Sequence, residues 1–308
     1  MPLDRRALKR AARDSIRTAT PSARMVTLVY ILLTSGLTTV VNLFLQDPSV
    51  EMLALLEQGI DPTYVLEYMF SGEGLTLFFF VSVLLSLYSC VMQVGYIGYA
   101  MGVARGRPAG YGDLIGAFSF AGRVIGVAVM VFLYAMMWSM VVILPFTVVL
   151  VFVAIALDPF TTAVLYIVPV LLVMMLMLRY ALVFYALADD PGVGVFGAIR
   201  KSQLLMRGNK LRYVTLMLSF FGWMVLASGL AFLGASVGET LGGPYLSAIL
   251  GLLAGLPLEL WLVPYMECAV VNFYDALQAG AAPEQPHRPA GGDPEPKRPA
   301  YRDDPWEN

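Results

Sequence analysis

Long runs of apolar residues, separated by short polar stretches, dominate the pattern along the chain. The runs are continuous and do not alternate with a period of two, which favours helices over the strands of a membrane barrel. A helix that crosses the bilayer core needs about 20 mostly apolar residues, and several runs reach that length without a charge. The pattern predicts an all-α transmembrane bundle with six spans, at about 25–45, 75–103, 124–157, 161–187, 213–236 and 247–271.

Composition supports this prediction. Hydrophobic residues make up 58% of the chain and charged residues 14%, whereas soluble domains have roughly 45–50% and about 25%. A soluble fold is therefore disfavoured, and lipid is the solvent in which we expect the helices to be stable. We expect three regions: a basic amphipathic segment at 1–24, the membrane domain at 25–277, and a disordered, proline-rich tail at 278–308.

Lysine and arginine gather in alternate connecting segments of this six-span scheme. Seven lie before residue 25, three between 105 and 123, five between 200 and 212, and four in the tail, while the intervening loops contain none. Basic residues in short loops are retained on the cytoplasmic side of a membrane. The pattern predicts a multi-pass protein of a plasma or bacterial inner membrane with both termini in the cytoplasm. Arg179 alone falls inside a span.

Three cytoplasmic stretches have the spacing of amphipathic helices that lie in the membrane interface. They occupy 1–24, the region around 114–121, and the residues after Asp190 and Pro191, which form a good N-cap and first-turn pair. Such stretches are either basic anchors that face anionic lipid headgroups or copies of a repeated unit of interfacial helix plus hairpin. The third stretch continues into a basic loop that contains Arg200, Lys201, Arg207, Lys210 and Arg212.

Residues for covalent or metal chemistry are scarce. The single histidine, His287, lies in the tail, and Cys90 and Cys268 lie in apolar runs. The sequence has no Gly-rich phosphate loop, zinc spacing or nucleophile elbow. We therefore expect no catalytic residue, no metal site, no cofactor and no nucleic-acid partner.

Three ionisable residues stand at membrane depth, where a charge costs at least a few kcal/mol and usually faces a partner or water. They are Arg179, Glu259 and Glu267. One interpretation pairs Arg179 with Glu267; the other lets Arg179 reach the headgroups while the tyrosines form an interfacial belt. Glu259 is either a neutral, hydrogen-bonded carboxyl or a proton-coupling group. The predicted polar network comprises Arg179, Glu267, Glu259, Gln93, Tyr180, Tyr185, Tyr265 and Asn272.

Several motifs together resemble those of a known family. The run from Tyr180 to Asp189, with Pro191 after it, is similar to the signature of the bacterial integral membrane proteins called domain of unknown function 975. Similar motifs follow at Leu205 to Lys210, Leu218 to Trp223, Pro264 with Tyr265, and Asn272 to Tyr274. One departure is Val168 to Val170, where the family has a proline-glycine turn. The resemblance implies a multi-span membrane protein and brings no known activity, cofactor or catalytic residue.

Three functions remain open at this point. The first is a non-enzymatic membrane protein that acts through lipid or protein contacts at its basic cytoplasmic face. The second is a small-solute or ion transporter that uses the polar intramembrane layer, although inverted repeats are missing. A membrane-embedded enzyme comes third, because no nucleophile and base can be named.

Overall fold

The computed structural model describes residues 5–45, 55–56, 58–61, 63–64, 73–154 and 158–281, and every regular element among them is a helix. The longer elements are α1 (Arg5–Thr18), α2 (Ala23–Ile31), α3 (Leu37–Leu45), α6 (Glu73–Ala104), α8 (Ala121–Ala154), α9 (Pro159–Met177), α11 (Gly194–Met206) and α12 (Lys210–Ala281). Shorter elements join them: the π-helical turn η1 (Leu32–Gly36), α7 (Tyr111–Gly116), α10 (Val183–Asp189) and the 3₁₀ turns η2 (Ala117–Phe120), η3 (Leu178–Tyr180) and η4 (Pro191–Val193).

Five helical segments are long and apolar enough to cross a membrane. They are Ala23–Leu45, Thr76–Ala104, Tyr111–Phe152, Phe160–Asp189 and Lys210–Gly280. The first four overlap the first four predicted spans. The fifth contains both of the last two, which lie together in α12.

Helix α12 is nevertheless folded back on itself. The backbone leaves helical geometry at Gly242 (φ −159°, ψ 16°) and Gly243 (φ 73°, ψ −161°), and the positive φ of Gly243 is one that residues with a side chain rarely adopt. A Cβ atom on Gly238 would lie 2.5 Å from the Leu246 carbonyl oxygen, so the two arms touch through their backbones. The helix is therefore a hairpin with a first arm at 210–241 and a second arm at 244–281.

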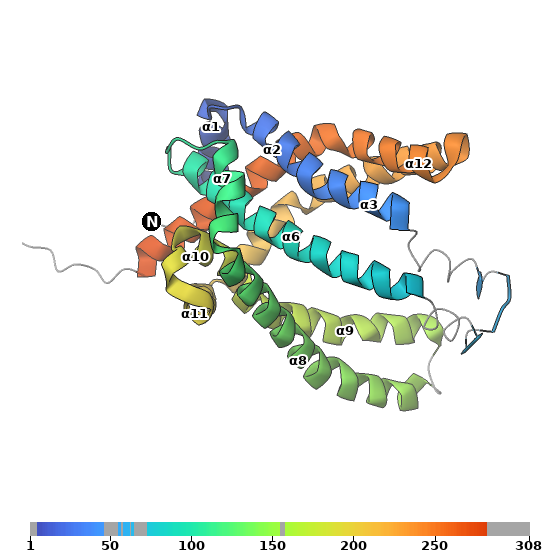
Figure 1. Ribbon diagram of the computed structural model, residues 1–308. Helices are drawn as coiled ribbons and strands as arrows, with labels where there is room; N and C mark the ends of the chain where they lie inside the picture. Colours follow the sequence, from blue (N-terminus) through green and yellow to red (C-terminus); the bar gives the residue numbers. More distant parts are fainter. Residues whose placement is uncertain are drawn as a thin grey trace, which may run out of the picture.

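The short helices gather at one end of the bundle. In Figure 1, α1, α7, α10 and α11 lie together at the left, and the long helices extend from them to the right. Helix α1 packs against α12, α7 against α6, and α10 against both α6 and α11, while α8 and α9 form a second hairpin. We call the left end in this view the short-helix end and the opposite end the far end.

Tight packing is concentrated near the short-helix end. Large side chains that are almost fully buried include those of Tyr96, Tyr99, Leu182, Met206, Phe273 and Tyr274. In contrast, large apolar side chains along the rest of the long helices are exposed, for example Phe80 at 63%, Phe152 at 73% and Phe160 at 78%. Such extensive apolar exposure is stable in lipid, where helix association does not depend on hiding apolar surface from water.

A serine from α11 stabilises an interruption in the fourth predicted span. The helix ends at Met177, passes through η3, and starts again at Val183. The hydroxyl of Ser202, which is completely buried, donates to the carbonyl of Arg179 (2.9 Å) and accepts from the N–H of Leu182 (3.2 Å). These bonds satisfy backbone groups that the break releases, which a break at membrane depth requires. The predicted span at 161–187 therefore contains a break in its helix at η3.

The predicted ends of the domains shift slightly. Helix α12 continues to Ala281, so residues 278–281 are helical and not part of a disordered tail. Residues 282–308 of the predicted tail, and most of the predicted loop 46–74, lie outside the described residues. In the N-terminal segment, α1 is the predicted amphipathic helix, and Ala12 on its apolar face is fully buried. Asp190 and Pro191 begin η4 as predicted, with the Asp190 carboxylate accepting from the N–H of Gly192 (2.9 Å).

Candidate functional site

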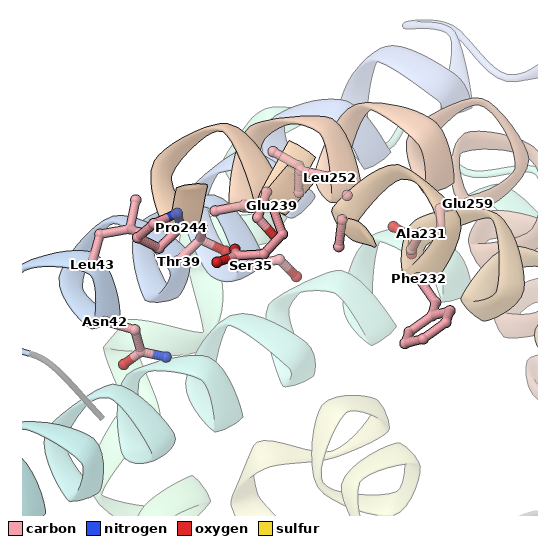
Figure 2. Close-up of a pocket in the computed structure, with 14 residues that line it drawn as sticks. Ser35, Thr39, Asn42, Leu43, Ala231, Phe232, Glu239, Pro244, Leu252 and Glu259 are labelled. Atoms are coloured by element: carbon pink, nitrogen blue, oxygen red, sulfur yellow. The ribbon is translucent and has the colours of Figure 1, made fainter. Parts of the chain in front are cut away.

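Glu259 lines a cavity of about 610 Å³ between η1, α3 and the two arms of α12. Figure 2 shows its labelled side chains, with Asn42 and Leu43 at one side of the view and Glu259 with Phe232 at the other. The remaining polar side chains on its wall are those of Ser35, Thr39, Asn42, Glu239 and Ser247. We call this space the carboxylate cavity. None of the other residues of the predicted network lines this cavity.

Glu267 lies deeper in the packed part of the bundle. The hydroxyl of Tyr185 donates to its carboxylate (2.6 Å), which joins α10 to the second arm of α12. Nearby, the hydroxyls of Thr27 and Tyr96 share a hydrogen bond (2.7 Å), and the rings of Tyr30 and Tyr96 stack with centroids 4.4 Å apart. Tyr185 and Glu267 are thus two members of the predicted network that the structure brings into contact.

The other members lie in different places. Asn272 donates to the carbonyl of Leu8 (3.3 Å) and holds α1. Tyr265 packs edge-on against Phe220, with centroids 5.2 Å apart, and Tyr180 stacks on Tyr134 at 5.1 Å. Gln93 is exposed. The single polar layer inferred from matching depths is therefore divided into separate contacts, because depth along a helix does not determine which face of that helix a residue occupies.

Arg179 and Glu267 do not form the ion pair that the sequence left open. Within the described ranges, no salt bridge joins them; Glu267 accepts from Tyr185, and Arg179 is exposed at the end of α9 in η3. Arg179 instead lines a pocket of about 290 Å³ with Gln203, Met206, Arg207, Gly208 and Lys210. A cation beside the last carbonyls of a helix is favourable, which explains its tolerance there. The second interpretation, in which Arg179 reaches outward, agrees with this position.

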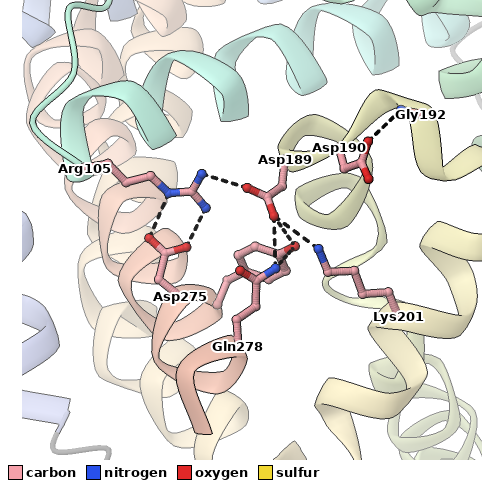
Figure 3. A network of polar contacts seen from close by, with 8 residues as sticks. Arg105, Asp189, Asp190, Gly192, Lys201, Asp275 and Gln278 are labelled. Carbon is pink, nitrogen blue, oxygen red and sulfur yellow. Dashed lines mark hydrogen bonds and ion pairs between the residues drawn. The ribbon is translucent and has the colours of Figure 1, made fainter. Parts of the chain in front are cut away.

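A charged network centred on Asp189 lies at the short-helix end (Figure 3). One carboxylate oxygen of Asp189 accepts from Arg105 (2.7 Å), and the other accepts from the Lys201 ammonium (3.2 Å), the Tyr274 hydroxyl (3.1 Å) and the Gln278 amide (3.0 Å). These partners belong to α6, α11 and α12 or follow them directly. The carboxylate therefore ties together four elements that are far apart in the sequence.

Arg105 completes this network through a second carboxylate. Its guanidinium donates twice to Asp275, from Nε (3.0 Å) and from Nη2 (2.6 Å), in the bidentate geometry that suits arginine. These bonds, together with the bond to Asp189, hold the pKa of Arg105 above its usual value despite partial burial. All three charged side chains are 18–33% exposed, so solvent weakens the pairs without removing them.

Of the predicted basic loop, Lys201 alone enters this network. Arg207 and Lys210 face the pocket beside Arg179, Arg212 donates to the side chain of Asn209 (3.2 Å), and Arg200 is exposed. The loop thus divides between one structural cation and a set of cations at the surface.

Three arginines converge on a second basic pocket. Arg13 and Arg17 of α1 and Arg24 of α2 line about 230 Å³ of space next to the second arm of α12. Ile16, Leu260, Trp261, Pro264 and Tyr265 form the rest of its wall, and no acidic residue is among these lining residues. We call this space the arginine pocket.

Helix α1 is attached to the bundle at this pocket. Lys9 donates to the carbonyl of Ser219 (3.2 Å), and its ammonium lies 3.9 Å from the centroid of the Phe220 ring. The guanidinium of Arg13 lies 5.8 Å from the Tyr265 centroid. Contacts between cations and aromatic faces stabilise such positions by about 0.5–2 kcal/mol. The exposed guanidinium groups of α1 are therefore held at fixed positions relative to the spans.

Arg105, Asp189, Asp275 and Gln278 were not recognised as interacting from the sequence. A signal was present: Asp189, Asp275 and Arg105 each stand within a few residues of the end of an apolar run. Acidic residues at this end of the apolar runs lie among lysines and arginines in the predicted scheme, so a cationic partner for each acid could have been expected. Nothing in the sequence showed which of the cations each acid would contact.

One comparison identifies a family. Residues 1–281 match the family described as "Protein of unknown function (DUF975)". No curated protein and no solved structure matches the chain. The match covers every described helix, including the Tyr185, Asp189 and Asp275 contacts, so the expected resemblance is confirmed. The chain belongs to the DUF975 family of proteins of unknown function.

Proposed function

We propose that this protein is a non-enzymatic, six-span protein of the bacterial cell membrane whose short-helix end faces the cytoplasm and binds the headgroups of anionic lipids. The six-span count is supported by the turn at Gly242 and Gly243, because each arm of α12 is long enough to cross a bilayer by itself. An even number of crossings returns the last helix to the side on which α1 lies.

The proposed orientation is supported by the distribution of charge. The basic residues of α1, of the segment after α6 and of α11 all lie at the short-helix end, where Arg105 and Lys201 occur in the network around Asp189. At the far end, Glu239 and Asp158 are acidic and no lysine or arginine occurs among the described residues there. Cations next to spans favour the cytoplasmic side.

The arginine pocket is the observation that carries the proposed activity. Three guanidinium groups around one small space repel one another, so a bound anion lowers the energy of the arrangement. Guanidinium groups bind phosphate oxygens in a bidentate manner. Leu260 and Trp261 on the same wall belong to the second arm of α12, which supplies apolar surface for the start of an acyl chain. A lipid phosphate fits this combination of charge and apolar surface.

The test compares two sets of arginine replacements in the purified protein. In nanodiscs of neutral lipid, added phosphatidylglycerol or cardiolipin is expected to raise Tm by about 5 °C at saturation, and native mass spectrometry should show retained anionic lipid. Combining Arg13→Gln, Arg17→Gln and Arg24→Gln should remove most of both effects. The matched control combines Arg5→Gln, Arg10→Gln and Arg200→Gln, which remove the same charge from exposed positions outside the pocket.

Retention of lipid by the control variant, together with its loss from the pocket variant, would support a defined site. Equal loss from both variants would show that only general surface charge attracts the lipid. Full retention by the pocket variant would contradict the proposed role of the arginine pocket.

Transport of a small solute is the second candidate, and the carboxylate cavity is the observation that favours it. Ionisable residues that face a polar cavity inside the membrane often mark a solute or ion path. Flux into liposomes, measured with a panel of solutes, separates the two candidates. Saturable flux that is lost on Glu259→Gln would support transport, whereas retention of anionic lipid without flux would support the contact role.

A further inference from the structure

The carboxylate cavity has the size of a small-molecule site. Its volume of about 610 Å³ lies within the range of about 300–1,000 Å³ that such sites occupy. Its walls come from three separate parts of the chain: η1 with α3, the first arm of α12, and the second arm of α12. The glycines at 238 and 234 let the two arms approach closely, which fixes two of the walls relative to each other.

The charge on the cavity wall has one sign. Glu239 and Glu259 line it, and the fourteen lining residues include no lysine, arginine or histidine. Among the described residues, neither carboxylate takes part in a salt bridge. The hydroxyls of Ser35, Thr39 and Ser247 add oxygen atoms that can accept hydrogen bonds. A cation is the ligand that this wall stabilises.

Glu259 lies deep in the predicted membrane segment, where a negative charge needs a partner or water. It follows Pro244, at the turn of the hairpin, by 15 residues, which corresponds to about 22 Å along a helix. A carboxylate at that depth is costly unless it faces water or a partner. The cavity provides the polar space, and its labelled wall in Figure 2 extends from Pro244 and Glu239 to Glu259.

An apolar groove adjoins the cavity. Its volume is about 440 Å³, and it shares Thr39, Leu43, Ala248 and Leu252 with the cavity wall. The rest of the groove is formed by Leu32, Leu33, Gly36, Leu37, Val40 and Ile249. Several of these side chains are exposed on the surface that lipid would cover, among them Val40 at 50% and Ile249 at 52%. A ligand can therefore reach both spaces at once, with its apolar part in the groove.

We propose that the carboxylate cavity and its apolar groove bind an amphipathic organic cation, a molecule with one ammonium group and an apolar chain. The ammonium group occupies the cavity beside Glu259, the chain lies in the groove along η1 and α3, and Glu239 adds negative charge at the other end of the same wall. This site is distinct from the arginine pocket in charge and in position, so its existence does not depend on lipid binding at the short-helix end.

Binding of dodecyltrimethylammonium to the full chain in neutral nanodiscs tests this proposal. The radiolabelled compound should bind saturably above the level of empty nanodiscs and be displaced by the unlabelled compound. Dodecylphosphocholine has the same chain and an added phosphate, and dodecyl sulfate has the opposite charge; both should displace it at least tenfold less well. Tetramethylammonium, which lacks the chain, should also displace it at least tenfold less well.

Variants connect this binding to the cavity. Glu259→Gln is expected to weaken binding at least tenfold, whereas Asp61→Asn, which removes a carboxylate from an exposed position outside the cavity, should leave it unchanged. If Glu259→Gln does not fold, Glu239→Lys at the exposed end of the wall places a cation in the same cavity and should also weaken binding.

Three results would overturn the proposal. The first is the absence of a saturable component, and the second is wild-type affinity in both cavity variants. The third is equal displacement by dodecyl sulfate or by dodecylphosphocholine, which would show that charge is not recognised. Equal displacement by tetramethylammonium would overturn the role assigned to the apolar groove.

Discussion

Asp189→Asn is expected to lower the free energy of unfolding by about 2–3 kcal/mol, with a decrease in Tm of about 5–10 °C. The substitution preserves the size of the side chain but removes the charge that Arg105, Lys201, Tyr274 and Gln278 share. Breaking a fully buried ion pair costs about 3–5 kcal/mol, and the partial exposure of these side chains places the expected loss below that range. Thermal unfolding in a neutral detergent measures the effect.

Asp190→Asn is the matched control, because it changes the neighbouring carboxylate. Asp190 caps η4 through the N–H of Gly192 and takes no part in the network, and asparagine is also a good capping residue. Its Tm should stay within about 1–2 °C of the wild type, in line with the small effect of most surface substitutions. Equal Tm values for the two variants would show that the charge of Asp189 does not stabilise the fold, and would contradict the role assigned to the network.

Gly238→Ala is the second change with a large expected effect. The new Cβ atom would lie 2.5 Å from the Leu246 carbonyl oxygen and from the backbone nitrogen and Cα atom of Ser247, so the arms of α12 must move apart. Overpacking of this kind typically costs about 1–3 kcal/mol, and contacts with backbone, which cannot rotate away, place the expected loss near the upper end. The Tm of the purified variant reports the loss.

Gly229→Ala provides the comparison within the same arm. A Cβ atom at this position meets nothing within 4 Å, and alanine is the better helix former. Its Tm should equal or exceed that of the wild type. If Gly229→Ala and Gly238→Ala had the same Tm, the close approach of the two arms would be refuted, and with it the hairpin.

Much of the helical architecture follows from simple patterns. Continuous apolar runs predicted long helices, and five helical segments of the structure are long and apolar enough to cross a membrane. The backbone leaves helical geometry at Gly242 and Gly243, which lie between the last two predicted spans. The spacing of apolar residues predicted α1 with Ala12 on its buried face, and Asp190 with Pro191 marked the start of η4. These features depend on neighbours in the sequence, which a pattern can show.

Contacts between distant segments could not be predicted in the same way. The break at η3 depends on the hydroxyl of Ser202, a residue of a later helix, and the apolar run that contains η3 shows no sign of it. Depth alone suggested that Arg179 would meet Glu267, but Tyr185 provides the hydrogen bond to that carboxylate. The arrangement of helices around one another determines these partners, and periodicity within one helix does not specify it.

The carboxylate cavity illustrates the same limit. Glu259 was recognised as exceptional because of its depth, and the polar space that it faces is completed by α3 and the first arm of α12, whose lining residues are distant from it in the sequence. In the sequence, Ser35 and Asn42 are polar residues within the first apolar run, and Glu239 lies between the last two runs. The fold brings them together and gives the deep carboxylate a polar environment.

The six-span topology, with the short-helix end in the cytoplasm, is the claim on which the proposed function depends, and labelling of single cysteines in intact cells tests it most directly. After replacement of Cys90 and Cys268 by alanine, Thr240→Cys at the hairpin turn should react with a membrane-impermeant maleimide added outside, whereas Arg107→Cys should react only after permeabilisation. The reverse pattern, or labelling of both positions from the same side, would contradict the topology.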